Sequence, residues 1–306
     1  MTTDSQNVTE FPIDHVPAPV LQPTRPFYWS VRREVWENRS LYLAPLIVTT
    51  LVFFATMMNS ILLPRTLNRL PLDPVARHNV LVKPFSIAPA PIMLTCFIVG
   101  FFYALDALYG ERRDRSILFW KSLPVSDRTS VLAKASIPLV VLPLFAYALS
   151  LIVTTILLFV STSTMIASGF NPAILWREYR VMQEPVIMIY GLTVHALWFA
   201  PVYCWFLLIS AWAKRTPFLW AFLPVFVIGM LERMAFGSDY FGRFIKNRFA
   251  GAMTVAFQHN PKIMLDSVSH LTPIRFLTTP ALWCGLILSV FFLSAAIRLR
   301  RKREPI

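Results

Sequence analysis

The sequence predicts an all-α integral membrane protein with six transmembrane helices. Hydrophobic residues make up 56% of the 306 positions and charged residues only 15%, well below the roughly 25% of a soluble domain. A helix needs about 20 apolar residues to cross a hydrocarbon core of about 30 Å. The apolar runs lack period-2 alternation, which favours helices over a closed barrel. The six runs lie near residues 41–63, 89–109, 135–162, 186–213, 217–231 and 276–297, within a transmembrane domain of residues 41–297.

Two segments precede the first span. Residues 1–26 are polar and rich in proline, so we expect a mobile cytoplasmic leader without a secretory signal. Residues 27–40 place Phe27, Val31 and Val35 near one helical face, which suits an amphipathic helix lying in the membrane interface. A plain cytoplasmic extension of the first span is the alternative interpretation.

The fifth apolar run is short and contains Pro217 and Pro224. We expect this span to be broken, tilted or continued as far as Phe236. The connection that follows, residues 232–275, is too long for a simple turn and combines aromatic and basic residues at helical spacing. That pattern predicts one or two amphipathic helices on the extracytoplasmic side.

Both termini are predicted to lie in the cytoplasm. With the amino terminus inside, 17 of the 29 Lys and Arg residues fall in inside segments, as the positive-inside rule favours. The strongest indication is the basic tail, residues 298–306, directly after the last span.

The net charge of +13 indicates contact with anionic lipid head groups. The basic residues cluster at the ends of the apolar runs, where lipid is a better partner than nucleic acid. Cys96, Cys204 and Cys284 all fall inside predicted spans and far apart in sequence. They predict neither a disulfide framework nor a metal site.

The most informative segment, residues 110–134, separates the second and third apolar runs. It opens with a run of mixed charge from Glu111 to Arg115, which predicts a solvated, salt-bridged surface. Residues 117–120 then supply an apolar anchor. A solvated loop that carries the usual inside positive charges is the alternative interpretation.

A sharp turn follows this anchor. Leu123 precedes Pro124, and the residue before a proline avoids the helical region, so the first helix should end there. Ser126 or Asp127 can cap a second helix that continues into the third span. The segment is therefore predicted to form a helix, a break and a second helix at the membrane face.

These residues resemble the motif of ABC-2 type transporter permeases. The resemblance rests on the runs YGERRDRS at 109–116 and WKSLPVS at 120–126, on Lys134, and on the position of the motif after the second of six spans. It implies a cytoplasmic coupling helix, in the region 110–130, that seats in a groove of a separate ATP-hydrolysing subunit. It also implies that residues 27–40 form a connecting helix. The positions carried over as coupling residues are Glu111, Arg112, Arg113, Asp114, Arg115, Ser116, Trp120, Leu123, Pro124 and Ser126.

The resemblance implies a permease subunit of an ATP-driven exporter in the bacterial cytoplasmic (inner) membrane. None of the nine glycines is followed by lysine, so the chain lacks the G-x-x-x-x-G-K-[ST] phosphate cradle. It is expected to bind no cofactor and to perform no catalysis, while the ATP-binding partner uses ATP and Mg²⁺. A second permease subunit, identical or different, is expected to complete a dimer.

Two other function classes stay open at this stage. An intramembrane enzyme would need catalytic groups, and His195 stands alone in the fourth span without a recognisable catalytic motif. Asp106 is close enough to Arg112 or Arg113 to pair with one of them. A membrane-embedded sensor or regulatory subunit could use the same docking helix.

The substrate path is predicted from the first span alone. Four residues there could line a hydrophobic substrate path, although core packing between helices explains them equally well. They are Phe54, Met57, Met58 and Asn59.

Overall fold

The computed structural model describes residues 25–69, 73–122, 125–179, 181–257 and 268–302. Within these ranges the elements are helices, and the only strand-like pairing is an isolated bridge between Phe257 and Leu271. The fold is therefore all-α, as the sequence predicts. The leader lies almost entirely outside the described residues.

Six helical stretches among the described residues are long and apolar enough to cross a membrane. They correspond to the six predicted spans, and each is longer than the run predicted for it. These stretches are Ser40–Asn68, Ala76–Arg113, Asp127–Ala167, Ala173–Trp212, Pro217–Phe236 and Pro280–Lys302.

The amino-terminal half contains the first two spans and the segment between the second and third. Its helices are α1 (Pro26–Glu37), α2 (Ser40–Arg69), α3 (Pro74–Ile87), α4 (Pro89–Asp106), α5 (Tyr109–Arg113), α6 (Ser116–Ser122) and α7 (Asp127–Ser136). The sequence predicts a helix in α1, and its place at a membrane interface stays a prediction. The sequence does not predict α3, which lies between the first two predicted spans.

The carboxyl-terminal half begins with a short π-helical turn. This turn, η1 (Ile137–Val141), leads into α8 (Leu142–Ala167), α9 (Ala173–Glu178), α10 (Gln183–Trp212), α11 (Pro217–Phe236) and α12 (Tyr240–Ala256), and then into η2 (Val268–His270), α13 (Pro273–Leu277) and α14 (Pro280–Lys302). The fifth span continues to Phe236, which was one of the three expected outcomes. The last helix continues through the predicted basic tail as far as Lys302.

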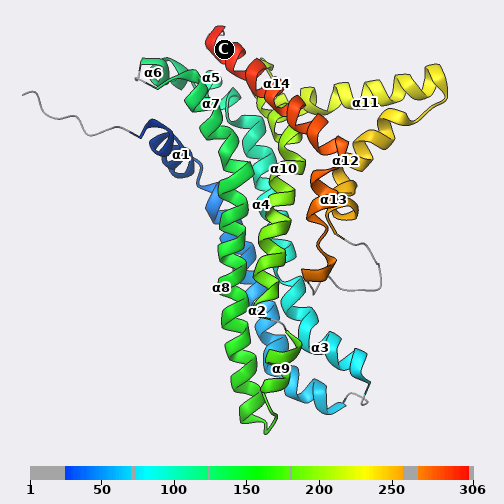
Figure 1. Cartoon of the computed structure of the whole chain (residues 1–306). Helices are drawn as coiled ribbons and strands as arrows, with labels where there is room; N and C mark the ends of the chain where they lie inside the picture. The colour runs from blue at the N-terminus through cyan, green and yellow to red at the C-terminus, as the bar shows by residue number, and fades with distance from the viewer. Residues whose placement is uncertain (1–24, 70–72, 123–124, 180, 258–267, 303–306) are drawn as a thin grey trace, which may run out of the picture.

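The long helices run alongside one another in a tall bundle, with α10 packed against α14 and α2 packed against α8 (Figure 1). Gly100 of α4 allows a close approach to η1, because a Cβ there would lie 3.1 Å from Cβ of Pro138. Helices α5 and α6 and the carboxyl end of α14 lie at one end, whereas α3 and α9 lie at the other (Figure 1). The stretch Asp127–Ala167 has 41 residues, about twice the length that a hydrocarbon core requires. The bundle therefore extends beyond one bilayer core.

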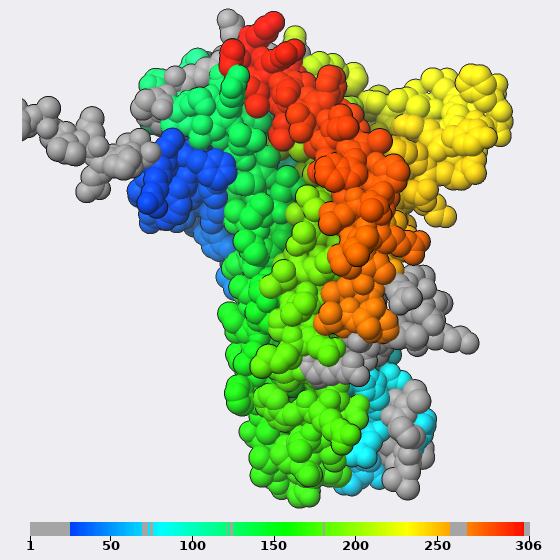
Figure 2. Space-filling view, viewed as in Figure 1, coloured from blue at the N-terminus to red at the C-terminus, as the bar shows by residue number. Residues whose placement is uncertain are grey.

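Helices α11 and α12 form an arm on the side of the bundle. Figure 1 shows α11 running across the bundle rather than along it, and Figure 2 shows the arm projecting from the surface. Gly237 ends α11 with φ of 61°, a left-handed conformation that glycine adopts without strain. Glu232 then accepts the backbone N–H groups of Tyr240 and Phe241 at 2.7 and 2.8 Å, which fixes the start of α12. The fifth candidate span thus departs from the direction of the others.

Candidate functional site

Charged side chains from four helices meet inside the end of the bundle that carries α5. Glu111 of α5 is only 8% exposed, and its carboxylate faces three cations from three other elements. Nζ of Lys134 lies 3.2 Å from its Oε1, and Nη2 of Arg300 lies 3.1 Å from its Oε2. Nη2 of Arg33 approaches Oε1 at 3.5 Å. The predicted coupling acid therefore joins α1, α7 and α14 to α5.

A second acid, Glu34 of α1, completes the connection between α1 and α7. Its Oε1 accepts a hydrogen bond from Nζ of Lys134 at 2.8 Å and one from Nη2 of Arg33 at 2.5 Å. Its Oε2 accepts the hydroxyl of Tyr103 in α4 at 2.8 Å. Burial raises the pKa of this carboxyl, but Lys134 and Arg33 outweigh burial and hold the pKa below its ordinary value.

The carboxyl-terminal helix joins the same cluster through Arg300. This residue of α14 is buried, and its guanidinium contacts both Glu111 and Asp127 at the start of α7. We call this cluster the ion network. Its members are Arg33, Glu34, Glu111, Asp127, Lys134 and Arg300, three acids and three bases. A buried charge is tolerated when an opposite charge accompanies it, and each of the six has at least one.

Arg112 anchors the same turn of α5 to the end of α10. It is only 2% exposed, and its Nη2 donates to the carbonyls of Ser210 and Ala213 at 2.9 and 2.5 Å. The hydroxyl of Ser210 in turn accepts the backbone N–H groups of Leu108 and Tyr109, both at 2.9 Å. A charged donor thus satisfies carbonyls that the end of a helix leaves open.

The solvated surface predicted for the charge run is therefore wrong for its first two residues. Glu111 and Arg112 are buried because the short helix α5 turns them toward the bundle, whereas Arg113, Asp114 and Arg115 are exposed. Arg113 lies 3.7 Å from Asp106, which confirms the pairing expected for that carboxylate.

The helix that follows presents an apolar surface to the outside. Arg115 has φ of 58°, a left-handed conformation that breaks the chain direction between α5 and α6. Ile117 is buried, but Leu118 and Phe119 are 59% and 60% exposed. We call these two side chains the α6 face. Trp120 lies behind this face. The guanidinium carbon of Arg33 is 3.9 Å from the centroid of the Trp120 ring, so the ion network contacts α6 directly.

The break after α6 is described only in part. Leu123 and Pro124 lie outside the described residues. Ser126 caps α7 as expected, because its Oγ accepts the backbone N–H of Thr129 at 3.1 Å. Ser116 lies at the start of α6, with its Oγ 3.4 Å from the carbonyl oxygen of Glu111.

The four predicted substrate-path residues lie in different surroundings. Phe54 and Met58 are exposed on α2. Met57 packs against an apolar cluster to which α2, α3, α8 and α9 contribute, whereas Asn59 lines a pocket between α2 and α3. Core packing accounts for Met57, and the assignment of the four residues to a substrate path stays a prediction.

His195 lies inside the bundle among aromatic side chains. Its Nε2 lies 3.2 Å from the hydroxyl of Tyr203, and Phe97 and Phe199 surround the ring. No group of three or more potential metal ligands occurs within the described ranges.

Four members of the ion network were predicted neither as site residues nor as part of the motif: Arg33, Glu34, Asp127 and Arg300. Glu34 falls on the apolar side of α1 together with Val31 and Val35, and an acid on an apolar face is a signal of a buried pair. Arg300 was assigned to lipid contact within the tail. Asp127 was considered only as a helix cap.

Comparisons of the chain with protein-family models, curated proteins and solved structures give no match.

Proposed function

We propose that this chain is the permease subunit of an ATP-driven exporter, with the α6 face as the docking site for a separate ATP-hydrolysing subunit. The observation that carries the proposal is the pairing of an exposed apolar surface with a buried ion network directly behind it. Leu118 and Phe119 are exposed on a short helix, and exposed aromatic residues at the centre of a small patch are typical of protein docking.

The ion network gives this surface a route into the bundle. Glu111 precedes α6 by one short turn and contacts Lys134, Arg33 and Arg300. A displacement of α6 is therefore transmitted through Glu111 to α1, α7 and α14. Packed elements with fixed polar contacts transmit displacement between sites, whereas a solvated loop absorbs it.

The resemblance of residues 109–126 to the coupling segment of ABC-2 type permeases supports the same assignment. In this proposal α1 is the connecting helix, both termini are cytoplasmic, and the protein resides in the bacterial inner membrane. It pairs with a second permease subunit, and its ATP-binding partner supplies the ATP and Mg²⁺ chemistry.

Co-purification tests the proposal. The tagged chain is solubilised gently from its native membrane, and bound proteins are identified by mass spectrometry. We expect a subunit with a phosphate-cradle motif in a one-to-one ratio. Recovery of this chain alone across several detergents would refute the exporter assignment.

A further inference from the structure

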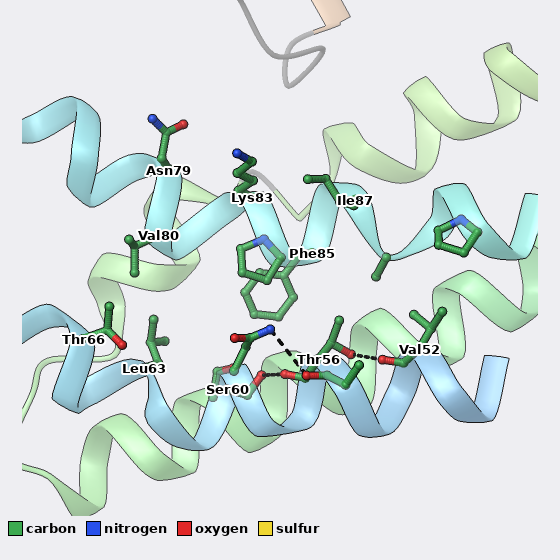
Figure 3. A pocket seen from close by; sticks show the side chains of 16 residues that line it. Val52, Thr56, Ser60, Leu63, Thr66, Asn79, Val80, Lys83, Phe85 and Ile87 are labelled. Carbon is green, nitrogen blue, oxygen red and sulfur yellow. Dashed lines mark hydrogen bonds between the residues drawn. The ribbon is translucent and has the colours of Figure 1, made fainter. Parts of the chain in front are cut away.

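A second feature lies away from the ion network, between α2 on one side and α3 with the start of α4 on the other (Figure 3). It is a pocket of about 520 Å³, within the range of small-molecule sites. Residues of α2 spaced three and four apart line its first wall, and the sequence between Asn79 and Pro91 lines its second. Ser161 of α8 also contributes to the lining.

Prolines explain why the two walls separate. Pro84 lies inside α3, Pro89 begins α4 and Pro91 follows within its first turn. Each proline removes one backbone donor and crowds the preceding turn, which bends a helix. The rod formed by α3 and α4 therefore bends near Ala88, beside the pocket.

One wall of the pocket carries a free cation. Lys83 lines the pocket, and its ammonium makes no hydrogen bond or ion pair with any residue in the described part of the chain. Figure 3 shows Lys83 and Asn79 projecting from the same side of α3, one turn apart and away from α2. Lys83 is exposed, so it lies at the open edge of the pocket. The α2 wall contributes the amide of Asn59 and the hydroxyl of Thr66. These groups suit an anion that also carries hydroxyl groups.

An independent observation concerns Ser161. This residue is 0% exposed, and its Oγ has no hydrogen-bond partner among the described residues. Buried hydroxyls are normally paired, since leaving one unpaired costs free energy. Because this hydroxyl is fully covered, a ligand supplies its missing partner by displacing the side chains that separate it from the pocket.

The rest of the lining is apolar. Val52 and Ala55 of α2 and Phe85 and Ile87 of α3 are among its apolar residues. A ligand that fills the pocket must therefore have a hydrocarbon part as well as a polar head. A free inorganic anion would leave the apolar walls unfilled.

We propose that this pocket binds an amphiphile with an anionic, hydroxyl-bearing head group, and that such a molecule belongs to the substrate class of the exporter, which rests on the function proposed above. Lys83 pairs with the anionic group, the amides and hydroxyls bind the head, and the hydrocarbon part lies along Val52 and Ile87. The same chemistry is offered by a lipid of the surrounding bilayer and by a soluble amphiphile.

Photolabelling tests the proposal without the ATP-hydrolysing partner. The purified full chain is placed in phosphatidylcholine nanodiscs that contain a diazirine-bearing phosphatidylglycerol. Adducts are mapped by peptide mass spectrometry. A second arm adds a water-soluble short-chain analogue with the same head group, and a third uses a diazirine-bearing phosphatidylcholine. We expect the anionic probes to label residues 52–66 and 79–91 in preference to the zwitterionic probe.

The variant Lys83→Gln should reduce this labelling about tenfold, because it removes a charge-assisted hydrogen bond. Arg77→Gln is the matched control, since it removes the same charge from α3 at a position outside the pocket lining, and it should leave labelling unchanged. Preferential labelling by the bilayer probe identifies lipid as the source, and labelling by the short-chain probe identifies a soluble amphiphile. Equal labelling by anionic and zwitterionic probes, or no effect of Lys83→Gln, would overturn the proposal. Neither result depends on whether an ATP-binding subunit co-purifies.

Discussion

The two ends of the bundle differ in how their charges are paired. At the end that carries α5, each of the six charges of the ion network has an opposite partner, although most of these side chains are buried. At the other end, Lys83 has no such partner among the described residues, and the buried hydroxyl of Ser161 is unpaired. Paired charges hold helices in one arrangement, whereas an unpaired cation and an unpaired hydroxyl that both line a pocket indicate a place for a ligand.

Removal of Glu111 is the strongest way to break this comparison. In Glu111→Ala the network keeps three bases but only two acids, and an uncompensated buried charge costs about 3–5 kcal/mol. We expect the unfolding free energy in detergent to fall by that amount. The measurement is thermal or denaturant unfolding at fixed detergent concentration.

Asp114→Ala is the matched control for this experiment. It removes an acid three residues away, but Asp114 is exposed, so the expected change is within about 0.5 kcal/mol. Equal losses in the two variants would show that the network does not stabilise the fold.

The second test uses pH and the other buried acid. Lys134 and Arg33 overcome the effect of burial and lower the pKa of Glu34, so its contribution to stability is present above the pKa of the unfolded chain, about 4.3. The contribution is lost as pH falls through the lower pKa of the folded state. Glu34→Gln should therefore flatten the loss of stability in acid, measured as unfolding free energy against pH.

Glu37 serves as the control because its shift has the opposite sign. Burial raises the pKa of this carboxyl, so its protonation favours the folded state as pH falls. Glu37→Gln should not reduce the loss of unfolding free energy at low pH. If the unfolding free energy of Glu34→Gln fell with decreasing pH as steeply as that of the wild type, the role of Glu34 would be contradicted.

The α6 face gives a smaller effect on the fold and a specific effect on binding. Phe119→Ser removes an exposed ring, so the unfolding free energy should change by no more than about 0.5 kcal/mol. Binding of the ATP-hydrolysing subunit should weaken at least about tenfold, as expected for a central aromatic anchor. Phe119→Leu should retain most of the binding. Unchanged binding of Phe119→Ser, measured by co-purification yield, would remove the α6 face from the interface.

The sequence predicted the helical class and the six apolar stretches because composition and run length determine both. It also predicted a cap at Ser126 or Asp127, which depends on local chemistry alone, and Ser126 is the one that caps α7. It misplaced Glu111 and Arg112 because a charge run in sequence does not reveal which residues a five-residue helix turns inward. Glu111 pairs with Arg33, Lys134 and Arg300, which lie 78, 23 and 189 positions away in the sequence. Such pairings depend on how α1, α7 and α14 pack. The pocket beside Lys83 was missed because it requires α3, which the sequence analysis took for part of a connection.

The smallest predicted effect concerns the unpaired hydroxyl. Ser161→Ala removes a buried polar group that has no partner among the described residues, so in the absence of ligand the variant should be as stable as the wild type or more stable by about 1 kcal/mol. Ser289 is the matched control, because it is also buried but its Oγ donates to the carbonyl of Gly285 at 2.8 Å. Ser289→Ala loses that bond, so it should be less stable than Ser161→Ala when both are unfolded in the same detergent. If Ser161→Ala were the less stable of the two, its hydroxyl would have a partner in the folded protein, and the contrast between the two ends of the bundle would lose one of its two supports.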